Sequence, residues 1–210
     1  SYIGTPYTST QLVGIGNKGI YTGPDILPNQ TKHLFSCGIS VATASAPPTT
    51  CVLCDYLMYY PAIDLDIVDV QYMINSSTLP RYSTGAGVQA FLSVATPMVS
   101  SGSIIISYTN QDGVSGRITT VPLLAVTSIG AIPITVTSGV LTQSLFIPLV
   151  NGDTGIRSIE SVQNTSSMSG TVNIVLCKPL ATVNVREAFT ETEKVFFTQN
   201  ANLVKIENGA

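Results

Sequence analysis

The sequence predicts an all-β protein: a two-sheet antiparallel sandwich, jelly-roll-like, with an extended N-terminal arm and a C-terminal tail. Short runs of β-branched residues alternate with turn residues over most of the chain. The body of the chain shows no sustained helical period and no repeat of about 20 to 50 residues. A length of 210 residues is sufficient for one such domain with a sizeable core.

Composition divides the chain into three parts. Residues 1–30 are rich in glycine and proline and show no strand or helix period, which predicts an extended arm. Such an arm buries little by itself, so we expect it to lie along the body or to reach a neighbouring subunit. Residues 31–185 form the predicted sandwich domain. Residues 186–210 form a tail, in which residues 190–197 fit a short helix or an added strand.

Nine strands are predicted in the body, at residues 33–44, 51–60, 88–95, 102–109, 116–123, 131–137, 143–150, 156–163 and 170–178. The clearest hairpin joins residues 104–109 to residues 117–120, because Asp112-Gly113 supplies the positive φ angles of a tight turn. We expect the core to contain Phe35, Ile39, Leu53, Leu57, Phe91, Ile105, Ile134, Phe146, Ile159 and Ile174.

Charge is scarce. Charged residues make up 10% of the chain, against about a quarter in a typical domain. Between residues 91 and 150 the only formal charges are Asp112 and Arg117. Outward-facing strand positions in this stretch are therefore neutral, which suits contact with another protein. We expect part of this surface to be covered in the working state.

The charge balance also limits the partners. The net charge is −3 and the nine lysines and arginines are scattered along the chain, whereas phosphate binding needs clustered cations, so nucleic acid is not expected. The sequence has no apolar run of about 18 residues and does not begin with a signal peptide, so we expect no membrane contact and a soluble protein made in the cytoplasm.

Four residues are of the types that bind tetrahedral zinc: His33, Cys37, Cys51 and Cys54. However, Cys51 and Cys54 lie in a predicted strand, where residues three apart point to opposite faces, whereas a zinc knuckle needs a turn. With Cys177, the cysteines are too sparse for a disulfide scaffold. We therefore expect buried thiols without metal.

Asp64, Asp66 and Asp69 could place carboxylates on one side of an extended segment and bind calcium. The segment lacks the alternating acidic ligands and the turn glycine of an EF-hand loop. A solvated acidic loop is the preferred interpretation.

No pattern predicts catalysis or a bound cofactor. Gly14, Gly16 and Gly19 match the spacing of a dinucleotide fingerprint, but no βαβ unit surrounds them. The single histidine, His33, lies in a predicted strand, and no Gly-x-Ser-x-Gly elbow is present. The chain has no tryptophan to form a sugar platform. We expect a protein that is not an enzyme.

Several stretches resemble those of virion structural proteins encoded by tailed bacteriophages. The matching stretches are residues 54–66 (CDYLMYYPAIDLD), 107–113 (SYTNQDG), 146–158 (FIPLVNGDTGIRS) and 178–182 (KPLAT). Together they span roughly residues 54 to 182. None of them is a catalytic signature.

The resemblance implies a β-sandwich component of the virus particle. We expect a decoration (cement) protein on the outer capsid surface, made in the host cytoplasm, with the major capsid protein and copies of itself as partners. Stiff sandwiches, bridging arms and neutral contact faces suit that role. The alternative is a tail, baseplate or receptor-binding component that contacts host surface sugar or protein. Copy number on the particle distinguishes the two.

Overall fold

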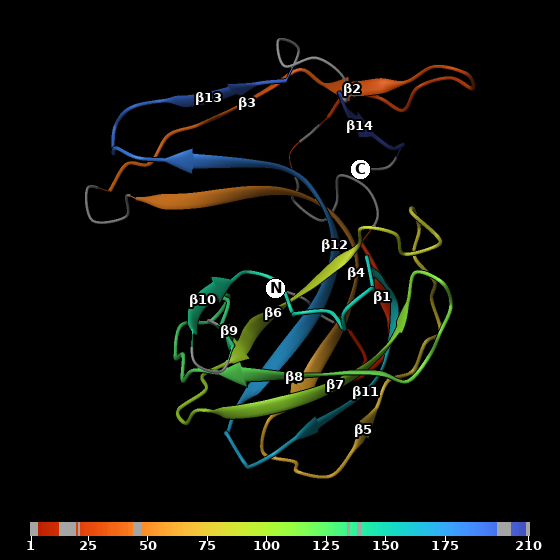
Figure 1. The fold of residues 1–210 in the computed structure, drawn as a ribbon, viewed down its shortest axis with the longest axis vertical. Helices are drawn as coiled ribbons and strands as arrows, with labels where there is room; N and C mark the ends of the chain where they lie inside the picture. The colour runs from red at the N-terminus through yellow and green to blue at the C-terminus, as the bar shows by residue number, and fades with distance from the viewer. Residues whose placement is uncertain are drawn as a thin grey trace. The chain divides into compact units, whose positions relative to one another are not determined.

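The computed structural model describes residues 4–12, 20, 22–43, 48–133, 135–137, 140–196 and 203–208. These residues form β-strands, turns and loops, and no helix that could cross a membrane is found among them. The strands pair antiparallel in several sheets. The expected all-β, sandwich-like fold is therefore confirmed (Figure 1).

Two larger sheets and two small ones contain all the named strands. The four-stranded sheet has the order β1 (Thr10–Gln11), β4 (Thr49–Asp64), β12 (Thr171–Val185), β6 (Gln89–Thr96). The six-stranded sheet has the order β10 (Val140–Ser144), β9 (Thr135–Thr137), β8 (Arg117–Leu123), β7 (Gly102–Asn110), β11 (Ile156–Asn164), β5 (Gln71–Tyr72). The small sheets pair β13 (Thr192–Val195) with β3 (Ser36–Ile39), and β14 (Val204–Ile206) with β2 (Lys32–Leu34).

The chain divides into two compact units. The first contains Ser1–Leu12 and Tyr56–Lys178, and the second contains Val13–Asp55 and Pro179–Ala210. The chain passes from one unit to the other three times: between Leu12 and Val13, within the long strand β4 and within the long strand β12. Residues of the predicted sandwich domain, 31–185, thus occur in both units. Residues 4–12 of the predicted arm belong to the first unit, where β1 pairs with β4.

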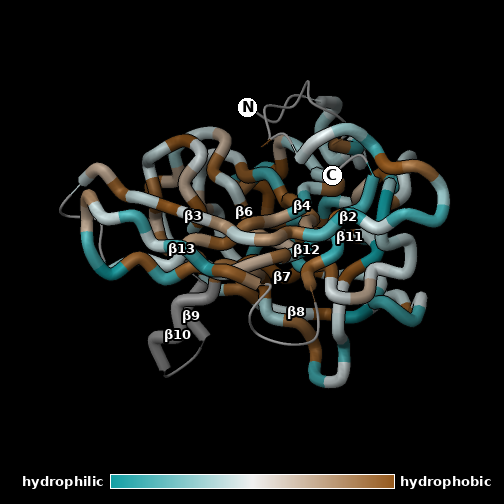
Figure 2. The backbone as a smooth tube through the Cα atoms, turned by 90° about the horizontal axis from the view of Figure 1, so that it is seen from above, coloured by the Kyte–Doolittle hydropathy of each residue, from teal (hydrophilic) through white to brown (hydrophobic). Residues whose placement is uncertain are grey.

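The core of the first unit is built from both larger sheets. Its buried cluster takes residues from β4, β6 and β12 of one sheet and from β7, β8 and β11 of the other. In β7 the burial alternates: Ile104, Ile106 and Tyr108 are at most 1% exposed, and the residues between them face outward. Strands β6 and β12 carry nearly continuous apolar runs (Figure 2), because both of their faces are covered.

The expected core is partly correct. Leu57, Phe91, Ile159 and Ile174 are buried, as predicted. Phe35 is 60% exposed, and its assignment to the core was wrong because it lies between β2 and β3 in the second unit, where little apolar surface is available to cover it. Half-buried positions are Ile39, Leu53 and Phe146, and Ile134 lies outside the described residues. The assignment of Ile105 to the core was wrong, because in the alternation of β7 it lies on the outward side, between the buried Ile104 and Ile106.

Most predicted strands are present, and the predicted hairpin is confirmed as β7 paired with β8. The strand expected at residues 33–44 is split into β2 and β3, which pair with different partners. The strand expected at residues 143–150 was wrong beyond Ser144, because residues 145–150 run as a loop into the turn at Asn151. In the tail, β13 is an added strand rather than a helix, since it pairs with β3.

Candidate functional site

The four zinc candidates lie in three different strands. His33 stands opposite Lys205 in the β2–β14 pair, and Cys37 lies in β3. Cys51 and Cys54 follow one another along the continuous strand β4, with no turn between them. Across the described part of the chain, no three His, Cys, Asp or Glu side chains are grouped so as to hold a metal ion.

The cysteines form no disulfide, and all four lie within the described residues. Cys177 in β12 is buried, as expected. The same expectation was wrong for Cys37, Cys51 and Cys54, which are half-buried. These three belong to the second unit, whose small sheets offer less apolar surface than the first unit's core.

The aspartate segment forms a hydrogen-bonded turn. Asp64 Oδ1 accepts a hydrogen bond from the Asp66 amide at 2.8 Å, and Asp66 Oδ1 accepts one from Ser167 Oγ at 2.9 Å. The side chain of Gln71 binds both the amide and the carbonyl of Asp64. Asp69 is exposed, and no metal-binding group includes these carboxylates in the described ranges.

The outward, paired positions of β5, β7, β8 and β11 carry no formal charge, and the two charged residues of β11, Arg157 and Glu160, fall at its unpaired positions. Tyr72, Ser161, Ser107 and Ile118 stand opposite one another across four strands. The next row contains Gln163, Ile105 and Thr120. Residues that are opposite in a ladder share a face. Their neighbours along β5 and β7 point into the core, as do Val121 of β8 and Val162 of β11. We call these seven side chains the neutral face: Tyr72, Ile105, Ser107, Ile118, Thr120, Ser161 and Gln163.

An apolar stripe lies along one edge of this face. Val68, Val70, Tyr72 and Ile74 are 47%, 39%, 73% and 56% exposed, whereas Gln71 and Met73 between them are buried. In an edge strand that faces water, the exposed positions are normally polar and the buried positions apolar, whereas here the exposed positions are apolar. β5 is the last strand of its sheet, so the stripe ends at a sheet edge. These exposed side chains form an apolar patch, a type of surface at which proteins often bind other molecules.

A buried carboxylate ties the β7–β8 hairpin to the loop that precedes β11. The Asp153 side chain is 3% exposed and accepts hydrogen bonds from Tyr108 Oη at 2.7 Å, Asn110 Nδ2 at 2.8 Å and Arg117 Nε at 2.9 Å. Tyr108 Oη also accepts a hydrogen bond from the Val150 amide at 2.8 Å. Both sides of the turn at Asn151 and Gly152 are thereby held against the hairpin.

These contacts shift two pKa values. Burial, followed by the hydrogen bond to Asp153, raises the pKa of Tyr108 to about 12. Burial acts to raise the pKa of Asp153, but the hydrogen bonds from Tyr108, Asn110 and Arg117 outweigh it, so the pKa lies below its ordinary value. Asp153 is therefore held as a carboxylate. Arg117, one of the two charges between residues 91 and 150, is neutralised by this pairing.

A second buried hydroxyl joins the two larger sheets. Tyr60 Oη of β4 donates to Asn75 Oδ1 at 2.6 Å and accepts from the Ile159 amide of β11 at 3.1 Å. Asn75 Nδ2 in turn donates to the Ile159 carbonyl at 3.0 Å. Tyr60 is fully buried, so water cannot replace these bonds.

Replacing Tyr60 with phenylalanine should lower the free energy of unfolding by about 1–3 kcal/mol, because the Ile159 amide and the Asn75 carbonyl oxygen lose their partner. The measurement is urea unfolding followed by circular dichroism. The matched control is Tyr72→Phe, at a side chain that is 73% exposed, which should stay within about 0.5 kcal/mol of the parent. Equal losses in the two variants would contradict the assigned network.

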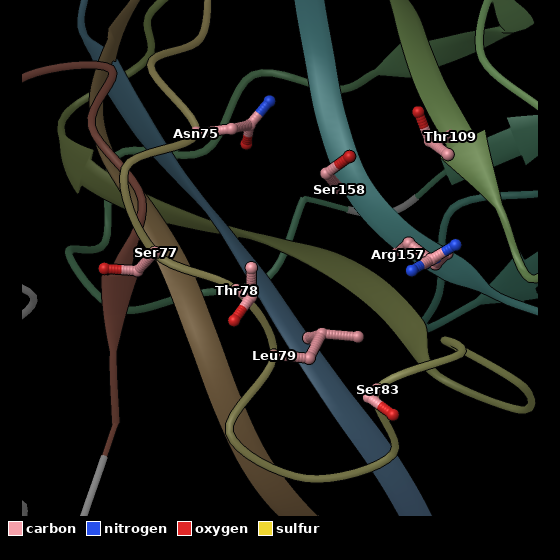
Figure 3. Close-up of a pocket in the computed structure, with 8 residues that line it drawn as sticks. All are labelled: Asn75, Ser77, Thr78, Leu79, Ser83, Thr109, Arg157 and Ser158. Carbon is pink, nitrogen blue, oxygen red and sulfur yellow. The ribbon is translucent and has the colours of Figure 1, made fainter. Parts of the chain in front are cut away.

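A small polar pocket lies beside this network (Figure 3). Its volume is about 220 Å³. On one side are Thr109 of β7 with Arg157 and Ser158 of β11; on the other side is the loop that follows β5. The loop contributes Asn75, Ser77, Thr78, Leu79 and Ser83.

The sequence predicted the neutral strand positions, but it predicted neither the apolar stripe, nor the Asp153 and Tyr60 hydrogen-bond networks, nor the pocket. The stripe was missed because Val68 lies within the acidic segment and Val70, Tyr72 and Ile74 directly follow it, and the sequence predicts a solvated loop there. The alternation of apolar residues through residues 68–74 was the available signal. Comparison with protein families, with curated proteins and with solved structures found no match to this chain.

Proposed function

We propose that this protein is a structural component of a tailed-bacteriophage virion that binds the outer surface of the capsid lattice and stabilises it. The neutral face with its apolar stripe is the observation that carries the proposal. The resemblance of residues 54–182 to phage virion proteins supports the same class. The partners are the major capsid protein and further copies of this chain.

The neutral face favours a protein–protein contact that is stabilised by buried surface and short-range hydrogen bonds rather than by ion pairs. Its outward positions offer Ser, Thr, Gln, Ile and Tyr side chains, which pack against a protein surface and form short-range hydrogen bonds. The stripe adds side chains whose burial is favourable at about 25 cal/mol per Å². A lattice partner would therefore be held without strong ion pairs.

The second unit supports a bridging role. Among its described residues, the buried hydrophobics are Ala181, Val183, Val185 and Ile206, whereas Leu27, Phe35 and Phe189 are 69%, 60% and 75% exposed. Two-stranded sheets such as β2–β14 and β3–β13 are marginally stable in water without a covering surface. A neighbouring capsid subunit would supply that surface, and repeated contacts over a lattice would add avidity.

The proposal is tested by adding purified protein to undecorated phage shells over a range of salt. We expect occupancy that changes little from low to moderate salt, because screening weakens ion pairs far more than apolar contacts. Decorated shells should also withstand a higher temperature than undecorated ones. Binding to tail structures alone, or release at moderate salt without any effect on the shell, would favour the tail or receptor-binding alternative.

A further inference from the structure

We propose that the polar pocket binds an oxyanion, a sulfate, phosphate or carboxylate group, through the guanidinium of Arg157. This binding site goes beyond the proposed capsid role. Its basis is an arginine with no hydrogen bond or ion pair to any described residue, set in a hollow lined by hydroxyl groups.

A β-bulge places Arg157 in the pocket. In the β11–β7 ladder Ile156 is opposite Asn110 and Ser158 is opposite Thr109, so Arg157 is the extra residue. A bulge re-aims the side chain that it carries and is common beside binding sites. The second irregularity of this ladder falls at Glu160. The two charged residues of β11 therefore occupy its two irregular positions.

Two glycines leave room for the Arg157 side chain. A Cβ atom on Gly85 would lie 2.7 Å from Arg157 Cγ, and one on Gly113 would lie 3.0 Å from Arg157 Nη1. Both glycines also have positive φ angles, 80° and 79°, so glycine is favoured there on two grounds. The side chain thus has a defined path along the protein surface.

Five of the other pocket residues are held by hydrogen bonds before any ligand arrives. Asn75 is fixed by Tyr60 and Ile159, and the hydroxyls of Thr109 and Ser158 both donate to Glu160 Oε1. The loop backbone is anchored at Ser77, whose amide donates to Ser9 Oγ at 2.8 Å, and at Thr78, whose carbonyl accepts from Gln11 Nε2 at 2.7 Å. A prearranged lining lowers the entropy cost of binding.

The remaining donors match an oxyanion. The hydroxyls of Ser77, Thr78 and Ser83 make no hydrogen bond to other described residues. A guanidinium with neighbouring hydroxyls binds the oxygens of a sulfate, phosphate or carboxylate through charge-assisted hydrogen bonds. The volume of about 220 Å³ is below the range of roughly 300–1,000 Å³ typical for drug-sized ligands. The pocket therefore fits one anionic group or a single acidic sugar.

The experiment titrates the ¹⁵N-labelled full chain with sodium sulfate, sodium phosphate, sodium glucuronate and glucose at constant ionic strength. We expect saturable shifts of the Thr78, Ser83 and Ser158 amides with the anions. Arg157→Gln should weaken binding at least about tenfold, the usual scale for losing a charged hydrogen bond. Arg186→Gln is the matched control at an exposed arginine of the second unit and should bind as the parent does.

Each outcome decides the proposal. Tighter binding of glucuronate than of sulfate and phosphate supports the site and identifies an acidic sugar as the source of the oxyanion. If sulfate or phosphate binds at least as tightly as glucuronate, the result supports a site for the free inorganic ion. The proposal is overturned if none of the three anions gives a saturable shift. It is equally overturned if Arg157→Gln binds like the parent, or if glucose binds as well as glucuronate.

Discussion

Replacing Asp153 with alanine should lower the free energy of unfolding by about 3 kcal/mol, because two buried donors, Tyr108 Oη and Asn110 Nδ2, lose their acceptor and each such loss costs about 1–3 kcal/mol. Tyr108 and Asn110 are 0% and 4% exposed, so water cannot readily take the place of the carboxylate. Arg117 is 31% exposed and would be solvated instead, so its ion pair adds little.

The measurement is the urea midpoint at pH 7, with Asp69→Ala as the matched control at an exposed aspartate. The control should remain within about 0.5 kcal/mol of the parent. If Asp153→Ala also stays within that range, the carboxylate does not hold the loop to the hairpin, and the assigned network is wrong.

The lowered pKa of Asp153 gives this prediction a pH dependence. The folded protein binds a proton at Asp153 less readily than the unfolded chain does, so the contribution of this group is complete above about pH 4, the ordinary range of an aspartate. It is lost as the pH falls through the lowered value. The stability difference between the parent and Asp153→Asn should therefore shrink as the pH falls below about 4. A constant difference down to the acid limit would contradict the assignment.

The parts of the fold that sequence reasoning predicted are those with strong local signals. Asp112-Gly113 marks the β7–β8 turn, and β6 and β12 carry apolar runs that are long enough to identify as strands. The strands that it missed are two or three residues long: β1, β5 and β14. Each exists because a distant segment pairs with it, and such pairing leaves little trace in a short local pattern.

The candidate sites depend still more on distant contacts. Asp153 meets Tyr108, Asn110 and Arg117 from 45, 43 and 36 positions away along the chain, and nothing in the local sequence distinguishes it from a loop aspartate. Arg157 reaches the pocket through a bulge, and a bulge follows from the pairing register rather than from residue type. The scarcity of charge between residues 91 and 150, by contrast, was visible in the sequence and corresponds to neutral positions on β7 and β8.

The central claim is that the neutral face and its stripe bind the capsid lattice. Introducing two carboxylates there, as Val70→Glu with Tyr72→Glu, should reduce the affinity for undecorated shells by about 100-fold or more. An uncompensated charge that becomes buried in a contact costs about 3 kcal/mol or more, and every 1.4 kcal/mol is a factor of ten. Both side chains are exposed in the free protein, so the fold should be retained, as circular dichroism can check.

The matched control adds the same charge to two exposed apolar side chains outside the stripe, as Val99→Glu with Ile129→Glu. The decisive measurement is the occupancy of undecorated shells at increasing concentrations of the parent, the stripe variant and the control variant, at one fixed salt concentration. The account predicts that the parent and the control saturate the shells at the same concentration, while the stripe variant needs concentrations about 100-fold higher or more to reach the same occupancy. Saturation of the shells by the stripe variant at the parent's concentration would contradict it.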